Sequence, residues 1–81
     1  SQIKNFPFSK IKIDSTFVRN AIERPECAAV IGAVATMGRR LGVRVVAEGV
    51  ETEAHHLLVK AEGCTEGQGY FYGEPVETRE I

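Results

Sequence analysis

The chain contains two segments, KIKID at Lys10–Asp14 and RVVAEGVET at Arg44–Thr52, in which residues typical of a buried strand lead into charged residues. A buried charge costs on the order of several kcal/mol unless it is paired or bound to an ion, so charge at the end of such strands needs an explanation. In α/β proteins, ligands bind at the carboxyl ends of parallel strands. The two segments therefore predict one wall of an enzyme active site.

The first segment has the side-chain period of a strand. Its two isoleucines fall on one face, and Lys10, Lys12 and Asp14 fall on the other. In a barrel, we expect the polar face to point inward.

Two helical segments follow the first strand. Ser15 and Thr16 are expected to cap a short helical turn over Phe17–Ile22. A longer amphipathic helix is predicted from Pro25 to Leu41, because proline suits the first turn of a helix and Gly42 supplies a stop.

The rest of the chain repeats the alternation of strand and helix. Val43–Ala47 is predicted to be a strand buried on both faces, and Thr52 is predicted to cap a helix that ends at Gly63. A third strand is expected at Gln68–Tyr72, ended by Gly73–Pro75. This order predicts an α/β fold with about three parallel strands.

The composition excludes several classes of function. The 81 residues carry a formal net charge of −1, so there is no basic surplus that would attract a DNA or RNA duplex. No apolar run approaches the roughly 18 residues of a membrane span, and the first residues lack the apolar region of a signal peptide, so we expect a cytoplasmic protein without membrane contact. Cys27 and Cys64 lie in separate segments and are expected to be free thiols.

Three motifs together resemble the carboxyl-terminal part of EAL domains: FPFSKIKID at Phe6–Asp14, VVAEGVET at Val45–Thr52 and GCTEGQGY at Gly63–Tyr70. EAL domains are metal-dependent phosphodiesterases that open cyclic di-GMP to linear pGpG, and they fold as a modified (β/α)8 TIM-like barrel. The resemblance implies that residues 1–81 are the carboxyl-terminal third of one such barrel, which is an incomplete domain.

The resemblance also implies two catalytic residues. Lys12 matches a lysine that positions the attacking water or the phosphate, and an ammonium group there can neutralise charge that grows on phosphoryl oxygens. Glu48 matches a glutamate that acts as general base or as a ligand of a second metal ion, and a carboxylate suits either task. The alternatives are a surface lysine and a glutamate paired with a neighbouring arginine.

Three further residues receive expected roles. Gln68 matches a glutamine near the substrate or its water, and a side-chain amide both donates and accepts hydrogen bonds. Asp14 is expected to bind substrate or position water, with capping of the following turn as the alternative. Glu51 matches a residue that stabilises a neighbouring loop.

The implied cofactor is Mg²⁺ or Mn²⁺ in the complete domain, with none expected in the fragment, because the ligands other than Glu48 belong to earlier strands. The implied partner is cyclic di-GMP. Three strands cannot close a barrel, so we expect the isolated fragment to be inactive and to self-associate, and the parent protein to be a homodimer. Two alternative functions remain open: a cyclic di-GMP receptor that has lost its metal ligands, and an interaction module.

Overall fold

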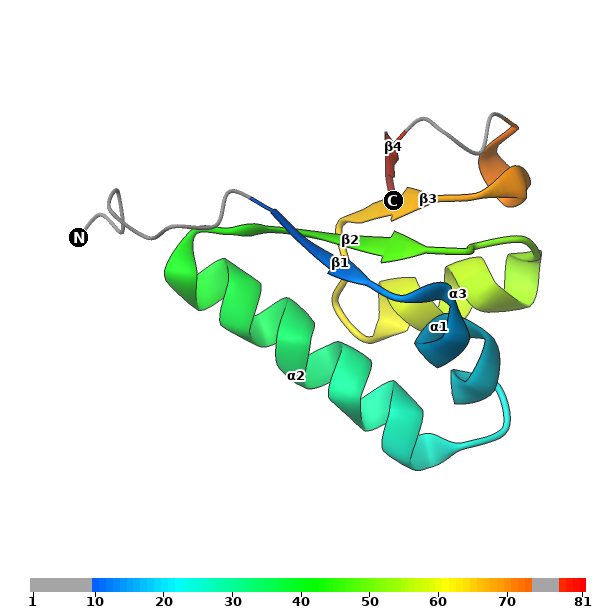
Figure 1. Cartoon of the computed structure of the whole chain (residues 1–81), viewed down its shortest axis with the longest axis horizontal. Helices are drawn as coiled ribbons and strands as arrows, with labels where there is room; N and C mark the ends of the chain where they lie inside the picture. Colours follow the sequence, from blue (N-terminus) through cyan, green and yellow to red (C-terminus); the bar gives the residue numbers. More distant parts are fainter. Residues whose placement is uncertain (1–9, 74–77) are drawn as a thin grey trace.

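The computed structural model describes residues 10–73 and 78–81 of the chain (Figure 1). Its elements, in chain order, are β1 (Lys10–Ile13), α1 (Ser15–Ala21), α2 (Pro25–Leu41), β2 (Arg44–Glu48), α3 (Glu53–Ala61), β3 (Glu66–Gln68), the 3-10 helix η1 (Tyr70–Tyr72) and β4 (Thr78–Glu80). The first four residues of the FPFSKIKID motif, and the Glu74 and Pro75 expected to help end the third strand, lie outside the described residues.

The four strands form one sheet in the order β1-β2-β3-β4. The pairs β1–β2 and β2–β3 are parallel, and β4 pairs with β3 in the antiparallel direction. In Figure 1 the three α-helices all lie on the same side of the sheet. The predicted α/β fold with three parallel strands and alternating helices is therefore confirmed, and it fits part of a barrel wall.

The hydrophobic core lies between the sheet and the helices. The strands contribute Ile13, Val45 and Ala47, and each of the three α-helices contributes at least one buried residue; these include Val18 of α1, Ile31 of α2 and Val59 of α3. Burial of one valine or isoleucine side chain stabilises a fold by about 1.5–3 kcal/mol. The period of two in β1 is confirmed, because Ile13 is buried whereas Lys10 and Lys12 are exposed.

Helix α2 begins and ends where the sequence predicts. Pro25 lies in the first turn, and Gly42 caps the end in the left-handed conformation with φ 71°. Two neighbouring boundaries differ from expectation. Helix α1 begins at Ser15, and its N-cap is Asp14 instead of Ser15 or Thr16, because the Asp14 carboxylate accepts a hydrogen bond from the Thr16 N–H. Strand β2 runs from Arg44 to Glu48, one residue later than predicted, and its central residues are buried as expected.

The prediction of a third strand at Gln68–Tyr72 is wrong for most of its length. The strand ends at Gln68, and the aromatic run Tyr70–Tyr72 forms η1. The cause is Gly69, whose φ of 151° turns the chain away from the strand and against the backbone of Val50. Strand β4 was not predicted, since a three-residue antiparallel strand depends on a partner 10 or more residues away.

Both cysteines are free, as predicted. Cys64 is buried between α3 and β3, and this burial raises the pKa of its thiol to about 11. Among the helices within the described residues, none has both the length and the apolar character to span a membrane.

Candidate active site

The face of the sheet opposite the helices carries the polar side chains. Side chains in register on neighbouring strands point to the same face. The register aligns Lys10 with Arg44, and Glu48 with Gln68. It also aligns Lys12 and Glu66 with Val46, which lies between them. We call this set of aligned residues the polar face.

Lys12 and Glu48 form an ion pair on the polar face. The Lys12 Nζ lies 3.5 Å from the Glu48 Oε2, and the two side chains are 55% and 29% exposed. Both charged groups therefore remain accessible to a ligand. The alternative in which Glu48 pairs with an arginine is not what the structure shows, because the guanidinium of Arg44 bonds Glu66.

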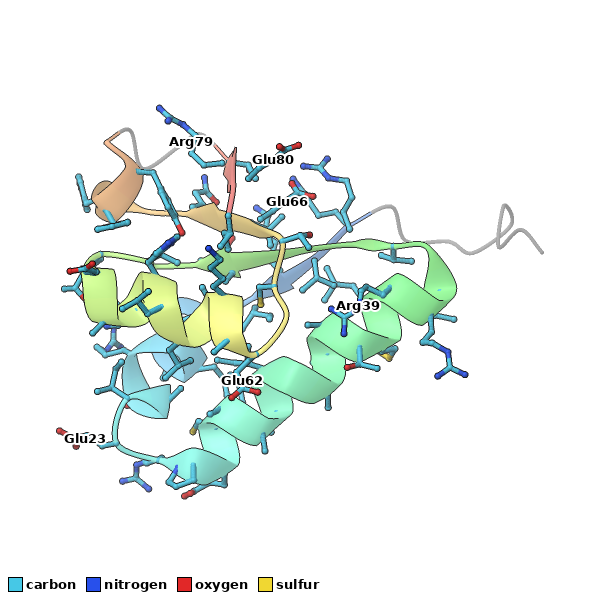
Figure 2. All side chains as sticks on the ribbon, turned by 180° about the vertical axis from the view of Figure 1, so that it is seen from behind. Glu23, Arg39, Glu62, Glu66, Arg79 and Glu80 are labelled. Carbon is cyan, nitrogen blue, oxygen red and sulfur yellow. The ribbon has the colours of Figure 1, made fainter. Side chains whose placement is uncertain are left out.

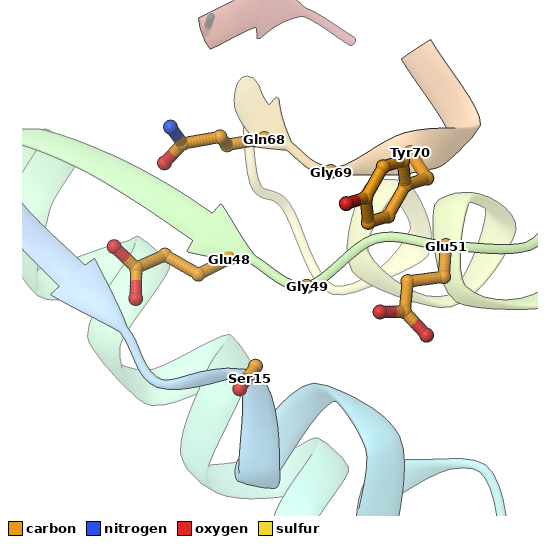
Figure 3. Close-up of a pocket in the computed structure, with 7 residues that line it drawn as sticks. All are labelled: Ser15, Glu48, Gly49, Glu51, Gln68, Gly69 and Tyr70. Carbon is orange, nitrogen blue, oxygen red and sulfur yellow. The ribbon is translucent and has the colours of Figure 1, made fainter. Parts of the chain in front are cut away.

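Three of the five predicted residues line one pocket. Figure 3 shows Glu48, Glu51 and Gln68 in this pocket, and the side chains of Glu48 and Gln68 extend in the same direction from neighbouring strands. The pocket has a volume of about 280 Å³ and is completed by Ser15, Gly49, Gly69 and Tyr70. It lies at the carboxyl edge of the parallel strands, where the sequence predicts it.

Ser15 and Tyr70 were not predicted from the sequence as lining residues. Ser15 follows the last residues of the KIKID segment directly, so its place after a strand end is a signal that identifies it. Tyr70 is 67% exposed at the pocket. Its position depends on the turn at Gly69, for which the sequence carries no comparable signal.

Lys12 and Asp14 lie outside this pocket. They belong to a second cavity of about 200 Å³, which is otherwise apolar and is lined by Ile11, Ile13, Phe17, Val30 and Val34. Lys12 is connected to the first pocket through its ion pair with Glu48. The Asp14 carboxylate accepts a hydrogen bond from the Thr16 N–H at 3.2 Å and so caps α1.

The backbone of Val50 joins the loop after β2 to the loop after β3. The Val50 N–H donates to the Gln68 carbonyl at 3.0 Å, and the Val50 carbonyl accepts from the Phe71 N–H at 3.0 Å. The Val50 side chain is fully buried in the core. This double link holds Gln68 at a fixed place beside the end of β2.

The start of α3 fixes the loop that contains Glu51. Thr52 caps the helix, as predicted, by accepting a hydrogen bond from the His55 N–H at 3.1 Å. The His55 Nδ1 in turn accepts from the Glu51 N–H at 3.1 Å. The Glu51 backbone is thereby held, while its side chain is exposed at the pocket.

Helix η1 packs on α3 through aromatic rings. The ring of Phe71 stacks on His56 at 5.1 Å between centroids, and the His56 Nδ1 lies 2.9 Å from the Tyr72 hydroxyl. Partial burial raises the pKa of Tyr72. His56 is therefore engaged with this cluster, which supports the position of η1 behind the pocket.

A second ion pair lies on the polar face, and sequence analysis did not find it. The guanidinium of Arg44 makes two hydrogen bonds to Glu66, at 3.0 Å from Nε and 2.6 Å from Nη2. These bonds lower the pKa of the Glu66 carboxyl and raise the pKa of Arg44. The two residues are 22 positions apart, so only the strand register could have revealed the pair.

The metal-ligand set on the described residues is incomplete. Among residues 10–73 and 78–81 no group of three or more His, Cys, Asp or Glu side chains is placed to hold an ion. Glu48 supplies one carboxylate, and the Gln68 amide oxygen extends beside it. The carboxylate is a hard oxygen donor of the kind that Mg²⁺ accepts, so Glu48 fits as one member of a larger set.

A mostly parallel sheet covered by helices on one face, with a polar pocket at the carboxyl edge of its parallel strands, fits the wall of an α/β barrel domain. Comparison with known proteins identifies the family. The family model of the EAL domain matches residues 1–75, and the chain belongs to the EAL domain family.

Relatives and solved structures agree with this family. The chain is 48% identical over 75 residues to an uncharacterized signaling protein of Caulobacter vibrioides. The aligned region makes up 93% of this chain but only 9% of that protein. It is 40% identical over 74 residues to the cyclic di-GMP phosphodiesterase PA2567 of Pseudomonas aeruginosa, covering 91% of this chain and 13% of that protein. The PaMucR phosphodiesterase, solved as a c-di-GMP complex, matches with a TM-score of 0.78 and 37% identity over 93% of this chain and 32% of that one.

Proposed function

We propose that the chain is the carboxyl-terminal part of a metal-dependent phosphodiesterase that hydrolyses cyclic di-GMP to linear pGpG. The observation that carries this proposal is the Lys12–Glu48 ion pair at the carboxyl edge of an EAL-family sheet. Glu48 of this pair lines a pocket together with Gln68. Residues 1–81 then form one incomplete barrel domain, completed by chain that precedes it.

Lys12 and Glu48 take complementary roles in this reaction. The ammonium of Lys12 lies close to a carboxylate and remains half exposed, so it can also approach a phosphoryl oxygen and neutralise the negative charge that develops there. The Glu48 carboxylate either accepts a proton from the attacking water as a general base or serves as a ligand of the second metal ion, and a carboxylate at the pocket wall suits both tasks.

Gln68 positions the water or the nucleotide. Its backbone carbonyl is occupied by Val50, so its side-chain amide is held at the pocket and can donate and accept hydrogen bonds there. Glu51, which lines the pocket, stabilises a neighbouring loop of the active site. Asp14 was expected to bind substrate or position water; its carboxylate caps α1, which supports an indirect role in orienting the first residues after β1.

Mg²⁺ or Mn²⁺ would be held by Glu48 together with ligands from the earlier strands. When bound, such an ion supplies polarisation of the phosphoryl oxygen and a water of lowered pKa. We propose a cytoplasmic location for the protein, and its free cysteines fit a reducing compartment.

The test is hydrolysis of cyclic di-GMP by the complete protein with Mg²⁺ or Mn²⁺. We expect linear pGpG from the unmodified protein and a loss of kcat of at least a hundredfold in both Lys12→Met and Glu48→Gln, because each removes a charge that the reaction uses. Matched controls are Lys60→Met and Glu53→Gln, which change the same residue types on exposed positions of α3.

A different pattern would favour the receptor function. If the folded complete protein binds cyclic di-GMP in a titration but forms no product with either metal, it is a receptor. Absence of binding as well as turnover would favour the interaction module.

We also propose that the isolated fragment is inactive and self-associates, and that the parent protein is a homodimer. Within the described residues β1 pairs only with β2, and the second cavity leaves apolar side chains along the unpaired side of β1. Such an edge is a template for pairing with another chain.

A further inference from the structure

The polar face carries more charge than the Lys12–Glu48 pair. The register places three basic and three acidic residues on it: Lys10, Lys12, Arg44, Glu48, Glu66 and Glu80. Figure 2 shows Glu66 and Glu80 on neighbouring strands. The formal charges of these six groups sum to zero. Which of them can attract a ligand therefore depends on which basic and acidic side chains form ion pairs with each other.

The two ion pairs have the same offset along the strands. Lys12 is in register with Val46 but reaches Glu48, two residues further along β2. In the same way, Arg44 precedes Val46 by two residues and reaches Glu66, which is the partner of Val46 on β3. Each cation therefore extends toward the carboxyl edge, to the acid on the next strand.

Glu66 has two further cations within reach when it is not held: Lys10 already lowers the pKa of its carboxyl, and Lys12 lies on the other side of Val46, with which both residues are aligned. Glu66 lies on the strand next to Glu48 and one diagonal position away, a separation of about 7–8 Å between side chains of neighbouring strands. The Glu66 side chain is 17% exposed, so water and salt screen its charge only in part. The two hydrogen bonds from Arg44 satisfy both of its oxygens.

We propose that Arg44 is a positioning residue, which holds the Glu66 carboxylate and thereby leaves Lys12 to Glu48 and to an anionic ligand. This inference rests on the proposed function, in which the ligand is a cyclic dinucleotide. Without Arg44, the freed carboxylate attracts the Lys12 ammonium and repels phosphate. Arg44 thus acts on the ligand through Glu66 and Lys12 without contact of its own.

The experiment measures the Kd of cyclic di-GMP for the complete protein by calorimetric titration in EDTA, where the nucleotide stays intact. We expect Arg44→Met to weaken binding by about three- to tenfold at low salt, as for one unscreened charge about 8–10 Å away. The ratio of the Kd of Arg44→Met to the Kd of the unmodified protein is expected to become smaller at 0.5 M salt, because salt screens exposed charges. A purely structural effect would not depend on salt in this way.

Two further variants test the role of Glu66. Adding Glu66→Gln to Arg44→Met is expected to restore the Kd to within twofold of the unmodified protein, since the competing charge is gone. Arg44→Lys, which keeps the positive charge, is also expected to stay within twofold. Failure of the double variant to recover affinity would overturn the proposal.

The matched control is Lys10→Met. It removes one positive charge from the same face and a weak attraction on Glu66, but it leaves Glu66 bonded to Arg44, so the change in Kd is expected to be less than twofold. A loss as large as that of Arg44→Met would show that only the total charge matters and would refute the positioning role. If the unmodified protein does not bind cyclic di-GMP at all, the proposed function itself fails.

Discussion

Two glycines determine how closely the loops approach one another at the carboxyl edge. Gly49 has a φ of 74° and lies against Ser15, and Gly69 has a φ of 151° and lies against the backbone of Val50. A side chain at Gly69 would overlap backbone atoms of Val50, which cannot move aside as a flexible side chain can. The requirement for glycine is therefore strict at position 69.

Gly69→Ala is expected to destabilise the complete protein by about 3 kcal/mol or more, because it adds an overlap with backbone to a conformation that only glycine adopts readily. Gly42→Ala is the matched control. It also has a positive φ, but it has no atom within 4 Å of the added carbon, so we expect a loss of about 1 kcal/mol. The Tm of each variant is measured by calorimetry and compared with that of the unmodified protein. Equal decreases in Tm for the two variants would contradict the expected overlap.

The sequence identified candidate site residues but not how their side chains pair. Lys12, Glu48 and Gln68 were identified because they occur at strand ends within motifs of the EAL family. The pairing of Arg44 with Glu66 could not be predicted, because these residues are 22 positions apart and meet only through the register of β2 and β3.

At the scale of the elements, Asp14 connects β1 to α1. Its carboxylate satisfies a free N–H in the first turn of a helix of only seven residues. Short helices contribute little stability of their own, so the cap and the burial of Val18 and Ala21 hold α1 in place. Since Ser15 is the first residue of α1, the cap also fixes one wall of the pocket.

Asp14→Ala is expected to lower the free energy of unfolding by about 1 kcal/mol, whereas Asp14→Asn should leave it nearly unchanged, because asparagine is an equally good cap. The second variant also separates capping from chemistry. We expect Asp14→Asn to keep kcat for cyclic di-GMP within twofold of the unmodified protein. A fall of tenfold or more in that variant would assign the carboxylate a direct part in the reaction.

Elements were predictable where local signals agreed with one another. Helix α2 has its proline, its apolar spacing and its terminal glycine in a consistent order, and its bounds were predicted correctly. The segment Tyr70–Tyr72 was mistaken for a strand because three aromatic residues favour extended structure, whereas contact with Val50 and the packing of Phe71 on His56 decide otherwise.

At the scale of the whole molecule, the described part of the chain is one side of a barrel. One face of the sheet is the polar face, and the helices cover the other. Within the described residues the first strand, β1, pairs on one side only. The second cavity, which forms an apolar groove beside β1, is lined in part by Phe17 and Val30, whose side chains are 41% and 44% exposed. In a complete barrel, preceding chain would cover these side chains.

The isolated 81-residue chain is expected to run as a dimer or larger species at micromolar concentration in size-exclusion chromatography with light scattering, because burial of the groove and the strand edge favours association. Val30→Asp is expected to reduce the average mass by placing a charge in the groove. Leu57→Asp, at an exposed position on α3, is the control and should leave the mass unchanged. A folded monomer for the unmodified chain would contradict this expectation.

The link at Val50 has a consequence for the thermodynamics of ligand binding. Both backbone groups of one buried residue tie together the ends of two strands, and Ser15 packs against Gly49 on the neighbouring side. The walls that carry Glu48 and Gln68 are therefore ordered when the chain folds, before any ligand binds. A ligand that enters this pocket loses its own freedom of motion but leaves the conformational entropy of these loops almost unchanged, which preserves more of the contact energy as affinity.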